Sequence, residues 1–113
     1  MAEVLQTLFH GSFAEQEPAE TFSSVSAGPA ANNVWEIDVV YLCSQAGAEI
    51  AVTLKKVLAS TDEVMILHVT NILPGETVTI GPMAMAEGDA LEVNVIGGTV
   101  DMIAYGREID TTV

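Results

Sequence analysis

The chain has 113 residues, half of them apolar, which is long enough for one hydrophobic core and too short for two. Sixteen acidic residues face three basic ones, Lys55, Lys56 and Arg107, so the formal net charge is −13. Nucleic acid backbones and anionic membrane surfaces repel such a charge, so we expect neither as a partner. The first residues lack the basic and long apolar regions of a signal peptide, and no apolar run approaches the roughly 18 residues that span a bilayer.

The apolar content is high and mostly aliphatic. The mean hydropathy is +0.41, although aromatic residues make up only 5% of the chain. In a chain this short, such an excess suggests that some apolar surface is buried between subunits. The single cysteine, Cys43, cannot form an internal disulfide, and it lies in an apolar run. It is therefore expected to be a buried thiol in a protein made in a reducing compartment.

The first 19 residues predict either an N-terminal arm or a first strand followed by a loop. Residues 4–9 (VLQTLF) are apolar enough for a strand, whereas residues 10–19 are mostly polar and contain Gly11 and Pro18. Weak alternation over 21–26 (TFSSVS) predicts another strand, and 27–33 (AGPAANN) is a connector rich in turn-forming residues. We place the start of the sandwich domain at residue 20 and its end at residue 113.

The clearest strand of the sequence covers residues 33–43 (NVWEIDVVYLC). Its odd-numbered positions predict an inward face, while Glu36 and Asp38 predict an outward one. Beyond Asp38 the second face becomes apolar too, which predicts that this end of the strand is covered on both sides. The predicted inward residues are Trp35, Ile37, Val39, Tyr41 and Cys43.

The remaining strands follow at short, regular intervals. Residues 49–57 (EIAVTLKKV) alternate, and residues 64–69 (VMILHV) are apolar on both faces. From residue 73 the turns Pro74-Gly75, Gly88-Asp89 and Gly97-Gly98 separate alternating segments, which predicts an antiparallel β-meander. The whole pattern predicts an all-β fold: a single antiparallel β-sandwich, jelly-roll-like, of about eight strands with an N-terminal arm.

Residues 35–109 resemble a type of small β-sandwich virion protein from tailed bacteriophages. Members of that type have an apolar strand ending at a short polar turn, a Pro-Gly-type turn, a Gly-Asp reversal and a final strand bounded by glycine. This sequence departs from the type in the connector at 27–33 and in the turn Cys43-Ser44-Gln45, and its N-terminal third has no counterpart. The matching residues are Leu73, Pro74, Gly75, Glu76, Thr77, Gly88, Asp89, Leu91, Val93, Gly98, Val100, Gly106, Glu108 and Ile109.

The resemblance implies a non-enzymatic phage structural protein, in the first place a capsid decoration (cement) protein. Such a protein would bind the outer surface of the assembled head and stabilise it. Its implied partner is the major capsid protein or another virion protein, and its implied location is the outer capsid surface after synthesis in the host cytoplasm. A homotrimer is implied too, because decoration proteins often occupy threefold positions. A neck or tail accessory protein is the alternative within this class.

A carbohydrate-binding β-sandwich used for host attachment is a second alternative, from a different functional class. Sugar platforms need exposed aromatic side chains, whereas Trp35 and Tyr41 are predicted to face inward. The aromatic residues left for such a platform are Phe9, Phe13, Phe22 and Tyr105.

The sequence offers no catalytic, cofactor-binding or metal-binding constellation, so we do not expect an enzyme. The only histidines are His10 and His68, and no set of His, Cys and Asp residues has the spacing of a zinc site. Glu36 and Asp38 share a strand face, but with no histidine or basic residue nearby a solvated face is the preferred interpretation. Weak calcium binding at the acidic turns 62–63 and 87–89 stays open.

Contacts with other subunits or with a capsid are expected at two apolar segments. Residues 1–13 carry large apolar side chains outside the predicted sandwich, and a neighbouring subunit could bury them. Residues 83–85 (MAM) follow Gly81-Pro82; they could form a core strand, or a contact because methionine adapts to irregular apolar surfaces. The expected contact residues are Val4, Leu5, Leu8, Phe9, Phe13, Met83 and Met85.

Overall fold

The computed structural model describes residues 6–16, 21–26, 28–59, 61 and 63–111. Within these residues the chain forms β-strands and no helix. The strands are β1 (Gln6–Ala14), β2 (Ser23–Ser26), β3 (Asn33–Ser44), β4 (Ile50–Val57), β5 (Val64–Ile72), β6 (Thr77–Ile80), β7 (Met83–Met85), β8 (Ala90–Ile96) and β9 (Thr99–Asp110).

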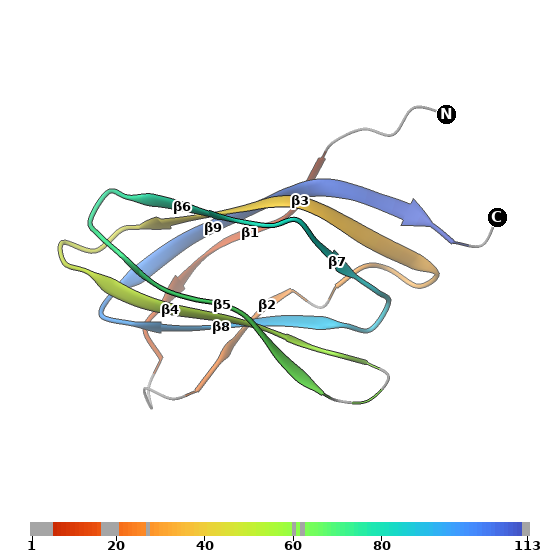
Figure 1. Cartoon of the computed structure of the whole chain (residues 1–113), viewed down its shortest axis with the longest axis horizontal. Helices are drawn as coiled ribbons and strands as arrows, with labels where there is room; N and C mark the ends of the chain where they lie inside the picture. Colours follow the sequence, from red (N-terminus) through yellow and green to blue (C-terminus); the bar gives the residue numbers. More distant parts are fainter. Residues whose placement is uncertain (1–5, 17–20, 27, 60, 62, 112–113) are drawn as a thin grey trace.

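Two antiparallel sheets stack face to face (Figure 1). The larger has the order β1-β9-β3-β6, with β7 also on β3, and the smaller has the order β2-β8-β4-β5. This arrangement is the jelly roll, in which most connections between successive strands cross from one sheet to the other. The predicted β-sandwich is confirmed. The predicted meander is wrong, because β8 lies in the smaller sheet and β9 in the larger, so Gly97-Gly98 joins two sheets instead of closing a hairpin.

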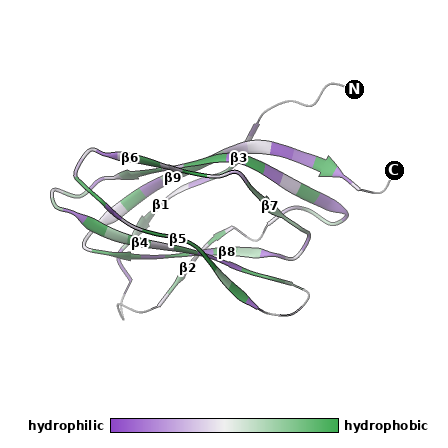
Figure 2. Cartoon of the chain, in the orientation of Figure 1, coloured by the Kyte–Doolittle hydropathy of each residue, from purple (hydrophilic) through white to green (hydrophobic). Residues whose placement is uncertain are grey.

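The hydrophobic core lies between the sheets, where the apolar residues of both inner faces meet. Hydrophobic residues alternate with more hydrophilic ones along the strands of both sheets (Figure 2). Alternation produces it: along β4 every second residue from Ile50 to Leu54 is buried, and along β8 the same holds from Leu91 to Val95. Trp35 is 7% exposed, which confirms its predicted inward position. Turn chemistry was also predicted correctly at Pro74-Gly75: Gly75 has a φ of 74°, and the Glu76 N–H donates to the Leu73 carbonyl at 3.0 Å.

A β-bulge in β3 reverses which residues face inward. Ile37 pairs with Gly106 of β9 and Val39 pairs with the preceding Tyr105, so Asp38 is an extra residue without a partner in the register. Side chains alternate with a period of two, so one extra residue exchanges the two faces for the rest of the strand. The inward residues beyond the bulge are Val40, Leu42 and Ser44. The prediction that Val39, Tyr41 and Cys43 face inward is therefore wrong.

Strand β1 is part of the larger sheet. It pairs with β9 from Gln6↔Gly106 to Ala14↔Thr99. Phe9 is buried, and its ring stacks on that of Trp35 with centroids 6.1 Å apart. Of the two interpretations of residues 1–19, the structure has a strand over residues 6–14. These residues belong to the sandwich, so the domain boundary placed at residue 20 does not separate them from it.

Gly106 lies where the larger sheet is most tightly packed. A Cβ atom there would be 2.1 Å from the Glu36 carbonyl oxygen and 2.8 Å from the Ile37 Cα. Both neighbouring strands carry their extra residue beside this point, Asp38 in β3 and Leu8 in β1. A residue without a side chain is therefore required for β9 to pass between them.

Candidate interaction surfaces

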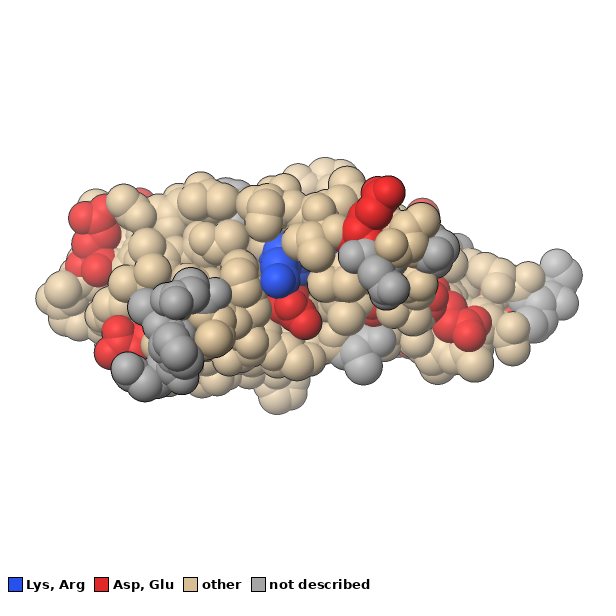
Figure 3. Space-filling model, turned by 90° about the horizontal axis from the view of Figure 1, so that it is seen from below, with Lys and Arg blue, Asp and Glu red and all other residues tan. Residues whose placement is uncertain are grey.

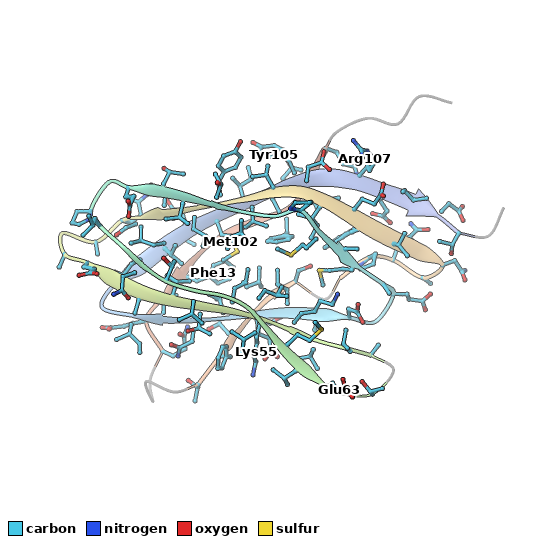
Figure 4. The ribbon with its side chains drawn as sticks, in the orientation of Figure 1. Phe13, Lys55, Glu63, Met102, Tyr105 and Arg107 are labelled. Carbon is cyan, nitrogen blue, oxygen red and sulfur yellow. The ribbon has the colours of Figure 1, made fainter. Side chains whose placement is uncertain are left out.

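The residues expected to contact another subunit lie mostly in this chain's own core. Phe9 and Met85 are buried, and Leu8, Phe13 and Met83 are partly buried and packed against the core. Figure 4 shows Phe13 pointing into the space between the sheets. The expectation of an external contact is therefore corrected for Phe9 and Met85, whose side chains the core encloses, and it stays a prediction for Leu8, Phe13 and Met83. Val4 and Leu5 lie outside the described residues.

The outer face of the larger sheet carries a pair of tyrosines. Tyr41 is 38% exposed, and its ring meets that of Tyr105 edge to face, with centroids 6.1 Å apart. Tyr41 pairs across the sheet with Ile103 on one side and Thr79 on the other. Tyr105 stands on the outer side of the sheet (Figure 4). Sequence reasoning missed this pair, because the bulge at Asp38 that turns Tyr41 outward leaves no mark in the alternation.

Glu36 and Asp38 lie on the same outer face and have a basic partner. Arg107 places Nη1 3.7 Å from a carboxylate oxygen of Glu36 and Nη2 3.4 Å from one of Asp38. The β3–β9 register sets this contact, since Glu36 is directly opposite Arg107. The two carboxylates therefore form part of a partly solvated ion cluster, which adds little stability.

Glu108 accepts two side-chain hydrogen bonds beside the Trp35–Phe9 stack. The indole N–H of Trp35 donates to Oε1 at 3.0 Å, and the amide of Asn33 donates to Oε2. Hydrogen bonds to the charged form favour it, so the side chains of Asn33 and Trp35 lower the pKa of Glu108 below its ordinary value. This carboxylate fixes the orientation of the indole at the margin of the core.

Asp89, in the second acidic turn, is a buried structural carboxylate. It is 5% exposed, and each of its oxygens accepts a main-chain hydrogen bond: Oδ1 from the Ala59 N–H at 3.0 Å and Oδ2 from the Ala86 N–H at 2.9 Å. The ammonium of Lys56 lies 3.8 Å from Oδ2. The carboxylate thus joins the β4–β5 connection to the β7–β8 connection, a role that sequence reasoning did not identify.

Two features are absent from the described residues: a metal-ligating cluster and a membrane-spanning helix. No group of three or more His, Cys, Asp or Glu side chains in that part of the chain is placed to hold a metal ion. Nor does that part of the chain contain a helix long and apolar enough to cross a membrane.

Strand β5, at the margin of the smaller sheet, carries the main exposed apolar surface. Val64, Met65, Ile66 and Val69 are between 46 and 68% exposed. Val64, Ile66 and Val69 pair with Val57, Lys55 and Thr53, which places them on the outer face, the side on which Figure 4 shows Lys55. The sequence correctly predicted a strand that is apolar on both faces, but gave no sign that it lies at an edge.

The smaller sheet also differs from the rest of the chain in charge. Its four strands contain Lys55, Lys56 and Glu92, a formal charge of +1 with histidine neutral, within a chain of −13. Lys55 forms an ion pair with Glu92 at 3.3 Å, and its ammonium lies 3.9 Å from the centre of the Phe22 ring. Figure 3 shows this face as largely uncharged, with a basic group and an acidic group side by side near its middle and further acidic groups toward its ends.

No family model matches this chain, and no curated protein matches it. Among solved structures it is similar to a chain of infectious bursal disease virus, Gt strain, with a TM-score of 0.59 and 9% identity over 96% of this chain and 32% of that one. It is similar to a protein of the disulfide-linked pili on Bacillus endospores, with a TM-score of 0.52 and 12% identity over 92% and 87% of the two chains. The Drosophila NLP core, described for pentamer formation and histone binding, has a TM-score of 0.52 and 12% identity over 88% and 97%. This chain spans about a third of the virus chain, and these likenesses show a shared jelly-roll fold.

Proposed function

We propose that this chain is a structural protein of a tailed-phage virion, in the first place a decoration protein on the outer surface of the head. The observation that carries the proposal is the jelly roll itself, which extends over nearly the whole chain and aligns with a virus chain over 96% of its length. Jelly rolls build viral capsid and lectin domains, and here the inner faces of both sheets form one hydrophobic core.

The net charge of the chain supports a position on the outer surface of the head. The charge of −13 is unfavourable beside packaged nucleic acid but harmless on the outside of a shell. The protein would stabilise the shell by binding the assembled form and not its free subunits, which amounts to about 2.7 kcal/mol per site at a concentration 100 times the Kd. Several copies, three at each threefold position as the resemblance implies, would add avidity.

The test is binding to assembled shells. Purified chain should sediment with empty heads built from the major capsid protein encoded nearest to it, should ignore the unassembled capsid protein, and should raise the temperature at which the heads fall apart. Sedimentation with isolated tails instead would favour the neck or tail accessory role. Binding to neither particle would refute a virion function.

The pair formed by the exposed Tyr41 and the partly buried Tyr105 favours one second candidate, a carbohydrate-binding surface. Tyr41 and Tyr105 offer adjacent aromatic rings with hydroxyl groups, flanked by Thr79. On a glycan array, binding that is lost in Tyr41→Ala and kept in Thr77→Ala, another exposed residue of the same sheet, would support it. An array without any binding, together with binding to heads, would leave the decoration protein.

A further inference from the structure

The outer edge of β5 has no strand beside it in the described part of the chain. β5 pairs with β4 on one side only, along Val57↔Val64 to Ile50↔Ile72. An edge strand presents a row of main-chain donors and acceptors, and proteins usually protect such edges with lysine, proline, charges or a bulge. β5 (VMILHVTNI) has a bulge at Leu67 but contains no proline, lysine or acidic residue. The bulge leaves residues 64–66 and 68–72 in regular register with β4, so the edge on either side of it remains competent to pair with another strand.

Apolar side chains flank this edge on both faces of the sheet. Val64, Ile66 and Val69 lie on the outer face, while Met65 lies opposite Lys56 on the other side of the strand. All four are roughly half exposed or more, and Val69 reaches 68%. Contiguous exposed apolar patches larger than roughly a few hundred Å² mark interaction sites in soluble proteins.

The distribution of charge favours a second copy of the chain as the partner. Two molecules of charge −13 repel one another, and the repulsion is weakest where their acidic residues are fewest. That place is the smaller sheet, with its formal charge of +1, whereas the strands of the larger sheet carry five acidic residues and one arginine. An uncharged apolar edge is complementary to itself, because an antiparallel pair related by a two-fold axis matches each edge with an identical one.

We propose that two copies of this chain associate through their β5 strands, which pair antiparallel and join the two smaller sheets into one continuous sheet. The contact joins two copies about a two-fold axis, so it cannot form a trimer. On a shell that carries the proposed trimers, it would connect one trimer to its neighbour. A nine-residue edge buries less than the roughly 800 Å² per partner of a stable complex, so the free pair should be weak and should strengthen when copies are held close together.

The experiment is sedimentation velocity over protein concentrations up to about 1 mM, where a weak pair with a micromolar to sub-millimolar Kd is populated. The wild-type chain should show a reversible doubling of mass. Val69→Lys and Ile66→Lys should abolish it, because lysine on an edge strand blocks pairing. Thr79→Lys, on the exposed edge strand β6 of the other sheet, is the matched control and should associate like the wild type.

The Thr79→Lys control also separates the effect of a lysine at the β5 edge from the effect of the changed net charge. Each lysine substitution makes the net charge less negative by one, so loss of pairing in Val69→Lys but not in Thr79→Lys cannot come from repulsion between the net charges of the two molecules and must arise at the β5 edge itself. Val69 is mostly exposed, so this variant should keep its circular dichroism spectrum and urea midpoint. Hydrogen exchange gives a second measurement: β5 amides should exchange more slowly at high than at low protein concentration.

Two results would overturn the pairing: a wild-type chain that shows no mass doubling at any concentration, or Val69→Lys that pairs as well as the wild type. The outcome is distinct from that of the virion proposal. Val69→Lys that stays unpaired but still binds heads supports both ideas, whereas a wild-type chain that pairs but binds neither heads nor tails refutes the virion function alone.

Discussion

Replacing Asp89 should destabilise the sandwich strongly, although the residue lies in a turn. Asp89→Ala removes both acceptors of the Ala59 and Ala86 N–H groups and the charge beside Lys56. A hydrogen bond to a charged group contributes about 1.5–3 kcal/mol. Ala59 and Ala86 lie at the surface, where water recovers part of the loss. We therefore expect Asp89→Ala to lower the free energy of unfolding by about 3 kcal/mol and the Tm by on the order of 10 °C.

Urea unfolding followed by the fluorescence of Trp35, the chain's only tryptophan, measures this change. Asp89→Asn keeps one acceptor oxygen and turns its NH₂ group toward the other N–H, so its loss should be about half as large. Glu49→Ala, at an exposed acid outside the strands, is the control and should change stability by no more than about 0.5 kcal/mol. A loss below about 1 kcal/mol for Asp89→Ala would refute a role for this carboxylate in joining the two connections.

Three further substitutions test the packing and the Trp35 environment. Trp35→Ala should cost about 3–5 kcal/mol in urea unfolding monitored by circular dichroism, as for other core aromatics, and a cost below about 1 would place the ring outside the core. Gly106→Ala should leave little or no folded protein, because its Cβ would overlap the Glu36 carbonyl oxygen; a folded variant with wild-type stability would contradict that close approach. Glu108 has a lowered pKa in the folded state, so its contribution is complete above the pKa of the unfolded chain and is lost as pH falls through the folded value. Acid titration of Trp35 fluorescence should show this step below the ordinary glutamate range, and a step that persists in Glu108→Gln would assign it to another group.

The order and type of most strands could be predicted, because alternation and turn residues act locally. Ile50, Val52 and Leu54 alternate with polar or small residues, and their burial follows directly. Pro74 and Gly75 specify their turn by their own backbone preferences. The β-sandwich class was therefore accessible from the sequence.

The pairing of the strands and the outward residues could not be predicted in the same way. Gly97-Gly98 has the composition of a hairpin turn, yet the same residues allow the chain to cross between sheets, and only the competition of all strands for the core decides between them. Asp38 looks like an ordinary outward position, so the bulge that exposes Tyr41 has no local sign. Whether β5 is an edge or a central strand depends on which strands occupy its two sides, and its own residues do not encode this.

The pairing of β1 with β9 has a consequence for the order in which the molecule folds. Phe13 pairs across the sheet with Val100, and most of the chain separates the two residues in sequence. Strand β3, in the same sheet, also pairs with β9 and so cannot form that pairing before β9 is present. During synthesis the larger sheet therefore cannot close until residues 99–110 have left the ribosome, and until then Phe9 and Trp35 lack part of their cover. Closing such distant contacts is slow, so refolding followed by Trp35 fluorescence should take milliseconds to seconds, as is typical of β-rich domains. A microsecond recovery of the native signal would show that the indole is enclosed before β9 arrives.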